Sequence, residues 1–243
     1  MSALTRIQLQ PAYLLHHRPY RDTSRILELF TRDHGRITVF ARGVRGGKGT
    51  TFGSALQSFH RVLVSYSNRG DAGQLTGVEF DGAMNEFPAA RTLSGFYLNE
   101  LILRLFERHD PHGDVFALYD ATVTALKRGE SDESLLLRIF EKRLLELLGY
   151  GLPLSFDCDI GEPITAERYY RFIAERGLIA FQGVSDGDNC FLGRSLLALR
   201  DEDLSDSSVR SDARRLLRAA LDNYLSGRVL KSREVMHSLR RMR

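Results

Sequence analysis

The sequence contains little cysteine and no long apolar run, and both shortages exclude classes of protein. Only Cys158 and Cys190 occur among the 243 residues, so the chain cannot carry a framework of several disulfides or an all-cysteine metal site of its own. Charged residues interrupt every apolar run far short of the roughly 20 residues that span a bilayer. Residues 1–15 lack the apolar core of a signal peptide, and we expect no such leader. The sequence therefore predicts a cytoplasmic protein without membrane contact.

The composition is that of an ordinary globular protein, but its charges are unevenly distributed. Hydrophobic residues make up 43% of the chain, and the formal net charge is +3. The net charge is +6 over residues 1–80, −4 over residues 81–150 and +7 over residues 210–243. Because clustered cations attract acidic partners, the two ends of the chain are the expected places for such contacts.

The apolar pattern changes from that of strands to that of helices near residue 82. Segments rich in β-branched and aromatic residues predict five strands, at 12–20, 24–30, 36–42, 59–67 and 74–80. Five short antiparallel strands within about 75 residues favour a small closed barrel over a sandwich. We predict an α+β protein with an N-terminal five-stranded OB-fold barrel at residues 1–82 and a mainly α-helical C-terminal domain at residues 83–243.

The second domain should contain six helices and one interruption. Helical periodicity predicts helices at 92–110, 114–129, 132–151, 194–202, 208–227 and 230–243. Residues 152–193 lose this periodicity, and we expect an inserted loop and a hairpin there, with strands at 168–175 and 177–183.

A loop rich in glycine and cations follows the third expected strand. A P-loop requires G-x-x-x-x-G-K-[ST], but Arg42 stands five residues before Gly47, and Gly49 follows Lys48. The loop also leads into a strand, whereas a P-loop leads into a helix. Arg42, Arg45 and Lys48 recur every three residues among glycines that allow close backbone approach. We interpret the segment as a loop that contacts the phosphates of a nucleic acid, with an affinity that falls as salt rises.

Neighbouring cations and aromatic residues extend this predicted surface. The residues assigned to nucleic-acid contact are Arg18, Arg21, Arg36, Arg42, Arg45 and Lys48. Candidate platforms for stacked bases, with filling of the barrel as the alternative role of each, are Tyr20, Phe40, Phe52, Phe59 and Tyr66.

No group of residues has the spacing of a catalytic site. The carboxylates at 201–203 lie in a polar segment without a predicted pocket. His16 and His17 are neighbours on one strand and point to opposite faces, and Ser195 lacks the strand-turn-helix setting of a G-x-S-x-G nucleophile. We therefore predict that the protein is not an enzyme.

Several motifs occur along the chain in an order known from one protein family. They are "TSRILELFTRDHGRITVFARGVR", "FYLNELILRLFE", "LLGYG" and "LKSRE", and together they resemble the RecO family of bacterial recombination mediators. The resemblance implies DNA repair and homologous recombination in the RecF pathway, with binding of single- and double-stranded DNA and annealing of complementary strands. It also implies work with RecR to load RecA onto DNA coated by the single-stranded DNA-binding protein SSB, and a place at the nucleoid.

The resemblance further implies a receptor for the C-terminal tail of SSB. This tail is acidic and ends in an aromatic residue. Such a receptor needs an apolar pocket with cations at its rim. The candidate cations are Arg138, Lys142, Arg228, Lys231 and Arg233, and a solvated helix surface is the alternative role of each.

Many members of the family carry a four-cysteine zinc site in the inserted region. The corresponding positions here are Cys158, Gly161, Ala180 and Gly183, so one ligand of four is present. We therefore predict no metal and no cofactor, with packing holding this degenerate zinc-finger region together.

Two other functions remain compatible with the residues. One is a nucleotide-hydrolysing repair enzyme that uses the glycine-rich loop, and the other is an RNA-binding adaptor with a similar barrel, since cations do not distinguish DNA from RNA. Phosphate release from ATP would favour the first, and competition between matched DNA and RNA oligonucleotides would decide the second.

Overall fold

The computed structural model describes residues 5–42, 55–68, 72–82, 86–129, 131–182, 189–225 and 227–241. The chain forms two compact units, one made of Met1–Gly129 with Leu230–Arg243 and the other of Glu130–Val229. The boundary expected near residue 82 thus lies inside the first unit. None of the helices in the described ranges combines the length and apolar character that a bilayer span requires.

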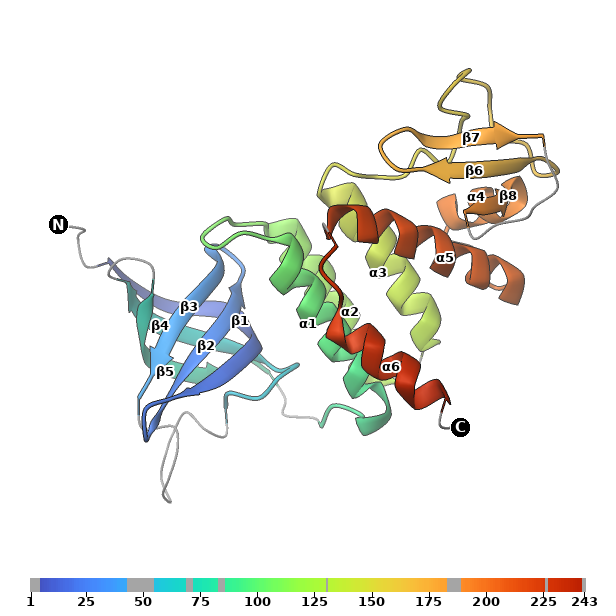
Figure 1. Ribbon diagram of the computed structural model, residues 1–243. Helices are drawn as coiled ribbons and strands as arrows, with labels where there is room; N and C mark the ends of the chain where they lie inside the picture. The colour runs from blue at the N-terminus through green and yellow to red at the C-terminus, as the bar shows by residue number, and fades with distance from the viewer. Residues whose placement is uncertain are drawn as a thin grey trace. The chain divides into compact units, whose positions relative to one another are not determined.

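The first unit begins with a closed barrel of five strands (Figure 1). The strands, in the spatial order β1-β2-β3-β5-β4, are β1 Thr5–Tyr20, β2 Ser24–Thr31, β3 Gly35–Ala41, β4 Arg61–Asn68 and β5 Gly73–Phe80. The pair β3–β5 is parallel and closes the barrel, while the other pairs are antiparallel. This architecture confirms the predicted OB-type barrel within an α+β protein.

Strand β1 begins at Thr5, seven residues before the predicted start at residue 12. It contains two irregularities that bend it around the barrel. Its register shifts between Ile7 and Gln10 against β4 and between Leu14 and His16 against β2. Such shifts increase the local bend and twist of a strand. Residues 5–13 of the bent strand pair with β4, and residues 12–20 pair with β2. This long strand thus helps to close the barrel.

One outer side of the barrel is covered by helices of the same unit. A short 3-10 turn, η1 Ala89–Arg91, precedes α1 Thr92–Leu105, and α2 Gly113–Arg128 follows. Tyr13 on β1 and Phe30 on β2 point out of the barrel, and their rings meet those of Phe116 and Tyr119 at centroid distances of 5.0–5.9 Å. Phe30 and Tyr119 are fully buried, so the barrel and these helices share a hydrophobic core.

The β2–β3 hairpin docks directly on the segment that joins α1 to α2. The backbone N–H of His109 donates to the carbonyl of Arg36 at 2.8 Å. Gly35 has a φ of +63°, and a Cβ at this position would lie 2.0 Å from the carbonyl oxygen of Asp110. Glycine is therefore required here for both its backbone conformation and its lack of a side chain.

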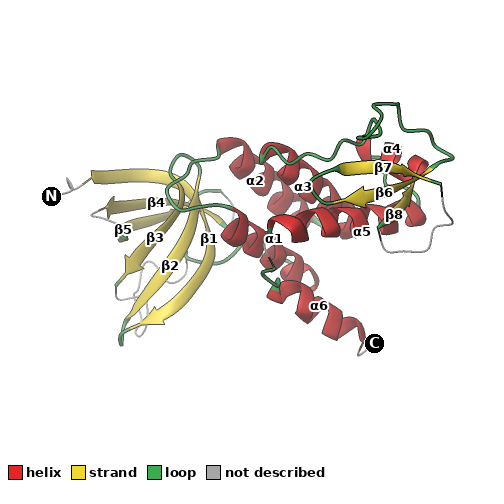
Figure 2. Cartoon of the chain, turned by 45° about the horizontal axis from the view of Figure 1, so that its top comes forward, coloured by secondary structure: helices red, strands yellow, loops and turns green. Residues whose placement is uncertain are grey.

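The end of the chain returns to the first unit as α6 Lys231–Arg241 and packs on α1 (Figure 2). The carboxylate of Glu100 on α1 accepts from the N–H groups of Lys231 and Ser232 and from the hydroxyl of Ser232, at 2.7–3.0 Å. Burial alone would raise the pKa of Glu100, but these donors hold it below its ordinary value. Glu100 thus satisfies free N–H groups at the start of α6.

The second unit combines three helices with a small antiparallel sheet. Its elements are α3 Glu133–Leu147, β6 Tyr169–Ile173, β7 Gly177–Phe181, β8 Cys190–Leu192, α4 Gly193–Arg200 and α5 Ser207–Tyr224. Helix α5 packs against α3 and α4, and the sheet order is β7-β6-β8. The two expected hairpin strands are present, and the third strand, β8, is too short to show a periodicity in the sequence.

A buried carboxylate holds the loop that precedes the hairpin. Asp157 is 2% exposed, and it accepts from the N–H groups of Asp159 at 2.8 Å and of Ala180 on β7 at 2.7 Å. Burial would raise the pKa of Asp157, but the backbone donors keep it below its ordinary value. The charged carboxylate therefore ties residues 157–160 to the hairpin.

We predict that Gly35→Ala lowers the free energy of unfolding by about 3 kcal/mol, because the new methyl group meets backbone and the left-handed conformation disfavours alanine. Gly113→Ala is the matched control, since a Cβ there meets nothing within 4 Å. Urea unfolding of both variants gives the comparison. Equal stability of the two variants would show that the hairpin does not dock on Asp110.

Asp157→Asn should lower the free energy of unfolding at neutral pH by about 1–3 kcal/mol, because an amide cannot accept at both positions. A lowered folded-state pKa stabilises the fold above a pH of about 4, and this contribution is lost as the pH falls through that pKa. The variant should therefore lose less stability than the wild type on acidification. Asp159→Asn, at an exposed ion pair with Arg176, serves as control, and a similar loss in both variants would contradict the assignment.

Candidate nucleic-acid interface

Strands β1, β2 and β3 present a row of side chains on the outer face of the barrel, with the buried Ile26 at its centre. Ile26 on β2 lies between Arg18 on β1 and Phe40 on β3. Leu27 and Val39 belong to the core inside the barrel, and alternate residues of a strand point to opposite faces. The row that contains Arg18, Ile26 and Phe40 therefore points out of the barrel.

An aromatic pair lies on this outward face. The rings of Tyr20 and Phe40 are 5.2 Å apart between centroids, and the guanidinium of Arg21 lies 5.3 Å from the centre of the Tyr20 ring. Tyr20 is 37% exposed. A partly exposed ring beside cations is the arrangement on which unpaired bases stack in proteins that bind single strands.

Three of the predicted cations surround this pair. Arg18, Arg21 and Arg42 are exposed, and within the described ranges none of them forms an ion pair with a carboxylate. Arg45 and Lys48 lie outside the described residues. OB folds bind oligonucleotides on the face of their second and third strands and on adjoining loops, where this cluster lies. We call Arg18, Tyr20, Arg21, Phe40 and Arg42 the barrel patch.

Arg36 was predicted to contact nucleic acid, but the structure gives its guanidinium a structural role. Its side chain is 11% exposed, and it donates to the carbonyls of Leu103 and Phe106 at the end of α1 at 2.7 and 2.5 Å. Burial lowers the pKa of this guanidinium, and Glu28 lies 3.6 Å away as its ion-pair partner. This placement gives no support to Arg36 as a phosphate ligand, because the side chain is mostly buried and its Nη1 already donates to two carbonyls at the end of α1.

Two of the candidate stacking residues are likewise interior. Phe59 is 5% exposed and packs on Phe87 and Phe96 at centroid distances of 4.4 and 5.1 Å. Tyr66 belongs to the core of the barrel. Phe52 lies outside the described residues. Among the described candidates, Tyr20 and Phe40 are therefore the two that remain available to a ligand.

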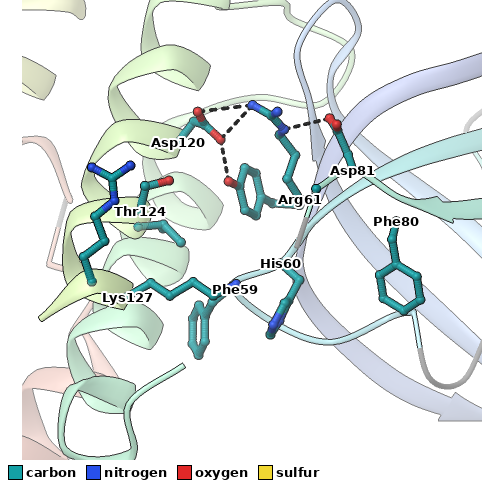
Figure 3. A pocket seen from close by; sticks show the side chains of 12 residues that line it. Phe59, His60, Arg61, Phe80, Asp81, Asp120, Thr124 and Lys127 are labelled. Atoms are coloured by element: carbon teal, nitrogen blue, oxygen red, sulfur yellow. Dashed lines mark hydrogen bonds and ion pairs between the residues drawn. The ribbon is translucent and has the colours of Figure 1, made fainter. Parts of the chain in front are cut away.

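A pocket of about 360 Å³ opens elsewhere in the first unit, between the barrel and α2 (Figure 3). Its lining residues are Tyr13, Phe59, His60, Arg61, Phe80, Asp81, Gly82, Asp120, Val123, Thr124, Lys127 and Arg128. Arg61 bridges the two sides, since its guanidinium lies 2.7 Å from Asp81 and 3.3 Å from Asp120. The hydroxyl of Tyr13 donates to Asp120 at 2.5 Å, and burial together with this bond raises the pKa of Tyr13.

The cations predicted on α3 are already paired with carboxylates of the second unit. Arg138 is 8% exposed and lies 2.7 Å from Glu141, which is 1% exposed. The ammonium of Lys142 lies 3.1 Å from Glu202, and Arg143 shares the same carboxylate at 2.6 Å. An acidic peptide that binds here would have to compete with these carboxylates.

The remaining predicted cations belong to different units. Arg228 is exposed in the second unit, and Lys231 is exposed at the start of α6 in the first. The side chain of Arg233 donates to the hydroxyl of Tyr97 at 3.2 Å and lies 5.5 Å from the centre of that ring. Arg233 therefore helps to hold α6 on α1.

The positions that correspond to the zinc ligands are held by other contacts. The N–H of Cys158 donates to the carbonyl of Leu178 at 2.8 Å, and Asp157 accepts from Ala180 as described above. Gly183 lies outside the described residues, which contain no group of three or more His, Cys, Asp and Glu arranged to hold a metal. The sequence could not show that Asp157 would supply this link, because nothing in its spacing distinguishes it from a solvated carboxylate.

Comparison with known proteins gives matches along nearly the whole chain. The family descriptions "Recombination protein O N terminal" and "Recombination protein O C terminal" match residues 5–82 and 89–234. The DNA repair protein RecO of Methylococcus capsulatus is 42% identical over 234 residues, covering 96% of this chain and 95% of the relative. The RecO proteins of Coxiella burnetii and Alkalilimnicola ehrlichii are 40% and 43% identical, covering 95% and 97% of this chain and 98% and 93% of the relatives.

Proposed function

This chain belongs to the RecO family of DNA repair and recombination proteins, and we propose that it acts as a mediator without a catalytic step of its own. In this proposal it binds single- and double-stranded DNA, anneals complementary strands and, with RecR, helps to load RecA onto DNA coated by SSB. Its place of action would be the cytoplasm, at the nucleoid.

The observation that carries the proposal is the barrel patch. In this proposal the exposed Arg18, Arg21 and Arg42 contact phosphates, and the adjacent rings of Tyr20 and Phe40 stack on bases. Contacts of these two kinds read no base edge. The Watson–Crick edges of a bound strand thus stay free to pair, while the arginines reduce the repulsion between two phosphate backbones. The same chemistry therefore supports both strand binding and annealing.

The acidic tail of SSB is proposed to bind the cations of the second unit. Lys142 and Arg143 already hold a carboxylate of Glu202 in a shared ion pair, and a tail carboxylate could take the place of Glu202. Arg138 is the buried member of this group, and Arg228, Lys231 and Arg233 remain a second predicted set.

Changing Arg18, Arg21 and Arg42 together to Ala should weaken binding of a single-stranded oligonucleotide. Three lost phosphate contacts reduce the slope of log K against log salt by about 2, at about 0.7 per contact. Fluorescence anisotropy at several salt concentrations measures both quantities, and annealing of SSB-coated complementary strands should slow in parallel.

The charge-matched control changes Arg168, Arg176 and Arg200 to Ala, each of which is ion-paired on the surface of the second unit. This control should bind DNA as the wild type does. If the two triple variants lose affinity equally, overall charge rather than the barrel patch determines binding.

Arg138→Ala should lower the free energy of unfolding by about 3–5 kcal/mol, because it removes the guanidinium that neutralises the buried carboxylate of Glu141. Changing Arg138 and Glu141 together to Leu should restore most of this stability. Thermal unfolding compares the three proteins. The folded double variant then decides the role in tail binding, since undiminished affinity for an SSB-tail peptide would remove Arg138 from the receptor.

A further inference from the structure

The pocket between the barrel and α2 is distinct in composition and position from the barrel patch. Figure 3 shows Asp120, Thr124 and Lys127 on its helix side and His60, Arg61, Phe80 and Asp81 on its barrel side. Its volume of about 360 Å³ falls in the range of pockets that hold small ligands. The pocket therefore has the size to enclose one compact chemical group.

The two carboxylates of the pocket share one guanidinium that belongs to the fold. Asp81 and Asp120 both pair with Arg61, and Asp120 also accepts from the hydroxyl of Tyr13. A cation entering the pocket would have to compete with Arg61 for either carboxylate. Because one guanidinium serves two carboxylates, this part of the pocket keeps one net negative charge, and Lys127 and Arg128 bring the five charged side chains to a net charge of +1.

Two cations of the pocket have no such partner. Within the described ranges, neither Lys127 nor Arg128 takes part in an ion pair or a side-chain hydrogen bond. They occupy the last turn of α2, but Arg91 already donates to the carbonyls of Leu126 and Gly129 there. Burial without a compensating carboxylate lowers the pKa of Lys127. Lys127 is partly buried and Arg128 is exposed, so both are open to an anion, which would form charge-assisted hydrogen bonds with them.

The barrel side of the pocket adds an aromatic surface. Phe80, at the end of β5, is 40% exposed. A large ring left open to solvent on the barrel side, across the pocket from the cations of the helix side, is suited to a ligand that joins a flat apolar group to an anion. A nucleotide has these two parts in its base and its phosphate.

We propose that this pocket binds one nucleotide of an unpaired DNA strand, with the phosphate at Lys127 and Arg128 and the base against Phe80. The inference rests on the proposed function, because it adds a second contact point for the strand that the barrel patch binds. A base held in a pocket must be unpaired, so this contact favours single strands over duplex DNA, while the phosphate contacts of the barrel patch serve both.

The test uses the full-length protein and a single-stranded oligonucleotide that carries one 2-aminopurine. Lys127→Gln/Arg128→Gln should weaken binding of the single strand about tenfold and reduce the salt slope by about 1.4, as expected for two phosphate contacts. Phe80→Leu keeps an apolar side chain but removes the ring, so it should abolish most of the fluorescence change that stacking produces. Both variants should bind blunt duplex DNA nearly as the wild type does.

The charge-matched control is Arg168→Ala/Arg176→Ala, which should leave single-strand binding unchanged. Wild-type affinity of Lys127→Gln/Arg128→Gln for the single strand, combined with weak binding by the barrel-patch variant, would overturn the pocket inference and leave the proposed function intact. Failure of the wild type itself to bind DNA would overturn both.

Two further outcomes would assign the pocket to another ligand. If the Gln variant keeps its affinity for the oligonucleotide but loses affinity for a peptide rich in Asp and Glu, the pocket takes an acidic peptide and the proposal is overturned. If free deoxyadenosine monophosphate binds the wild type as tightly as the oligonucleotide does and displaces none of it, the pocket takes free nucleotides and not a strand.

Discussion

The aromatic contact between one outer side of the barrel and helix α2 is the constraint on which the first unit depends. Tyr13 and Phe30 leave the barrel on this side and are buried by Phe116 and Tyr119. A polar bridge completes the contact, because Asn99 accepts from the Tyr119 hydroxyl and donates to the carbonyl of Leu15. A barrel that uses one side for packing has only its remaining surface for ligands, so this contact decides where the barrel patch lies.

The same contact separates the arginines into two groups that composition does not distinguish. Arg36, Arg61 and Arg91 attach the barrel to the helices or satisfy helix carbonyls. Arg18 and Arg21 have no such task within the described ranges. The +6 charge of residues 1–80 therefore overstates the cationic surface that faces a ligand, because part of this charge is used for folding.

Sequence reasoning succeeded where a local pattern decides the outcome. The alternation of apolar residues and the turn residues gave all five strands of the barrel, and the break in helical periodicity located the hairpin of the second unit. It could not anticipate the distant partner that a residue meets in the folded chain. The side chain of Arg36 points out of the barrel, as the alternation along β3 predicts. The end of α1 covers this part of the strand, and the carbonyls of Leu103 and Phe106 accept hydrogen bonds from the guanidinium. Asp157 is another such case, since its donor Ala180 is on a separate strand.

Arg61 shows how a structural ion pair also sets the electrostatics of a binding site. It sits at the start of β4 and joins Asp81, just past the end of β5, to Asp120 on α2. Without its guanidinium the pocket would contain two carboxylates that repel a phosphate and offset Lys127 and Arg128. With it, the five charged side chains of the pocket carry a net charge of +1. The bond that holds the helix on the barrel therefore also makes the proposed nucleotide pocket attractive to an anion, and the two roles cannot be changed independently.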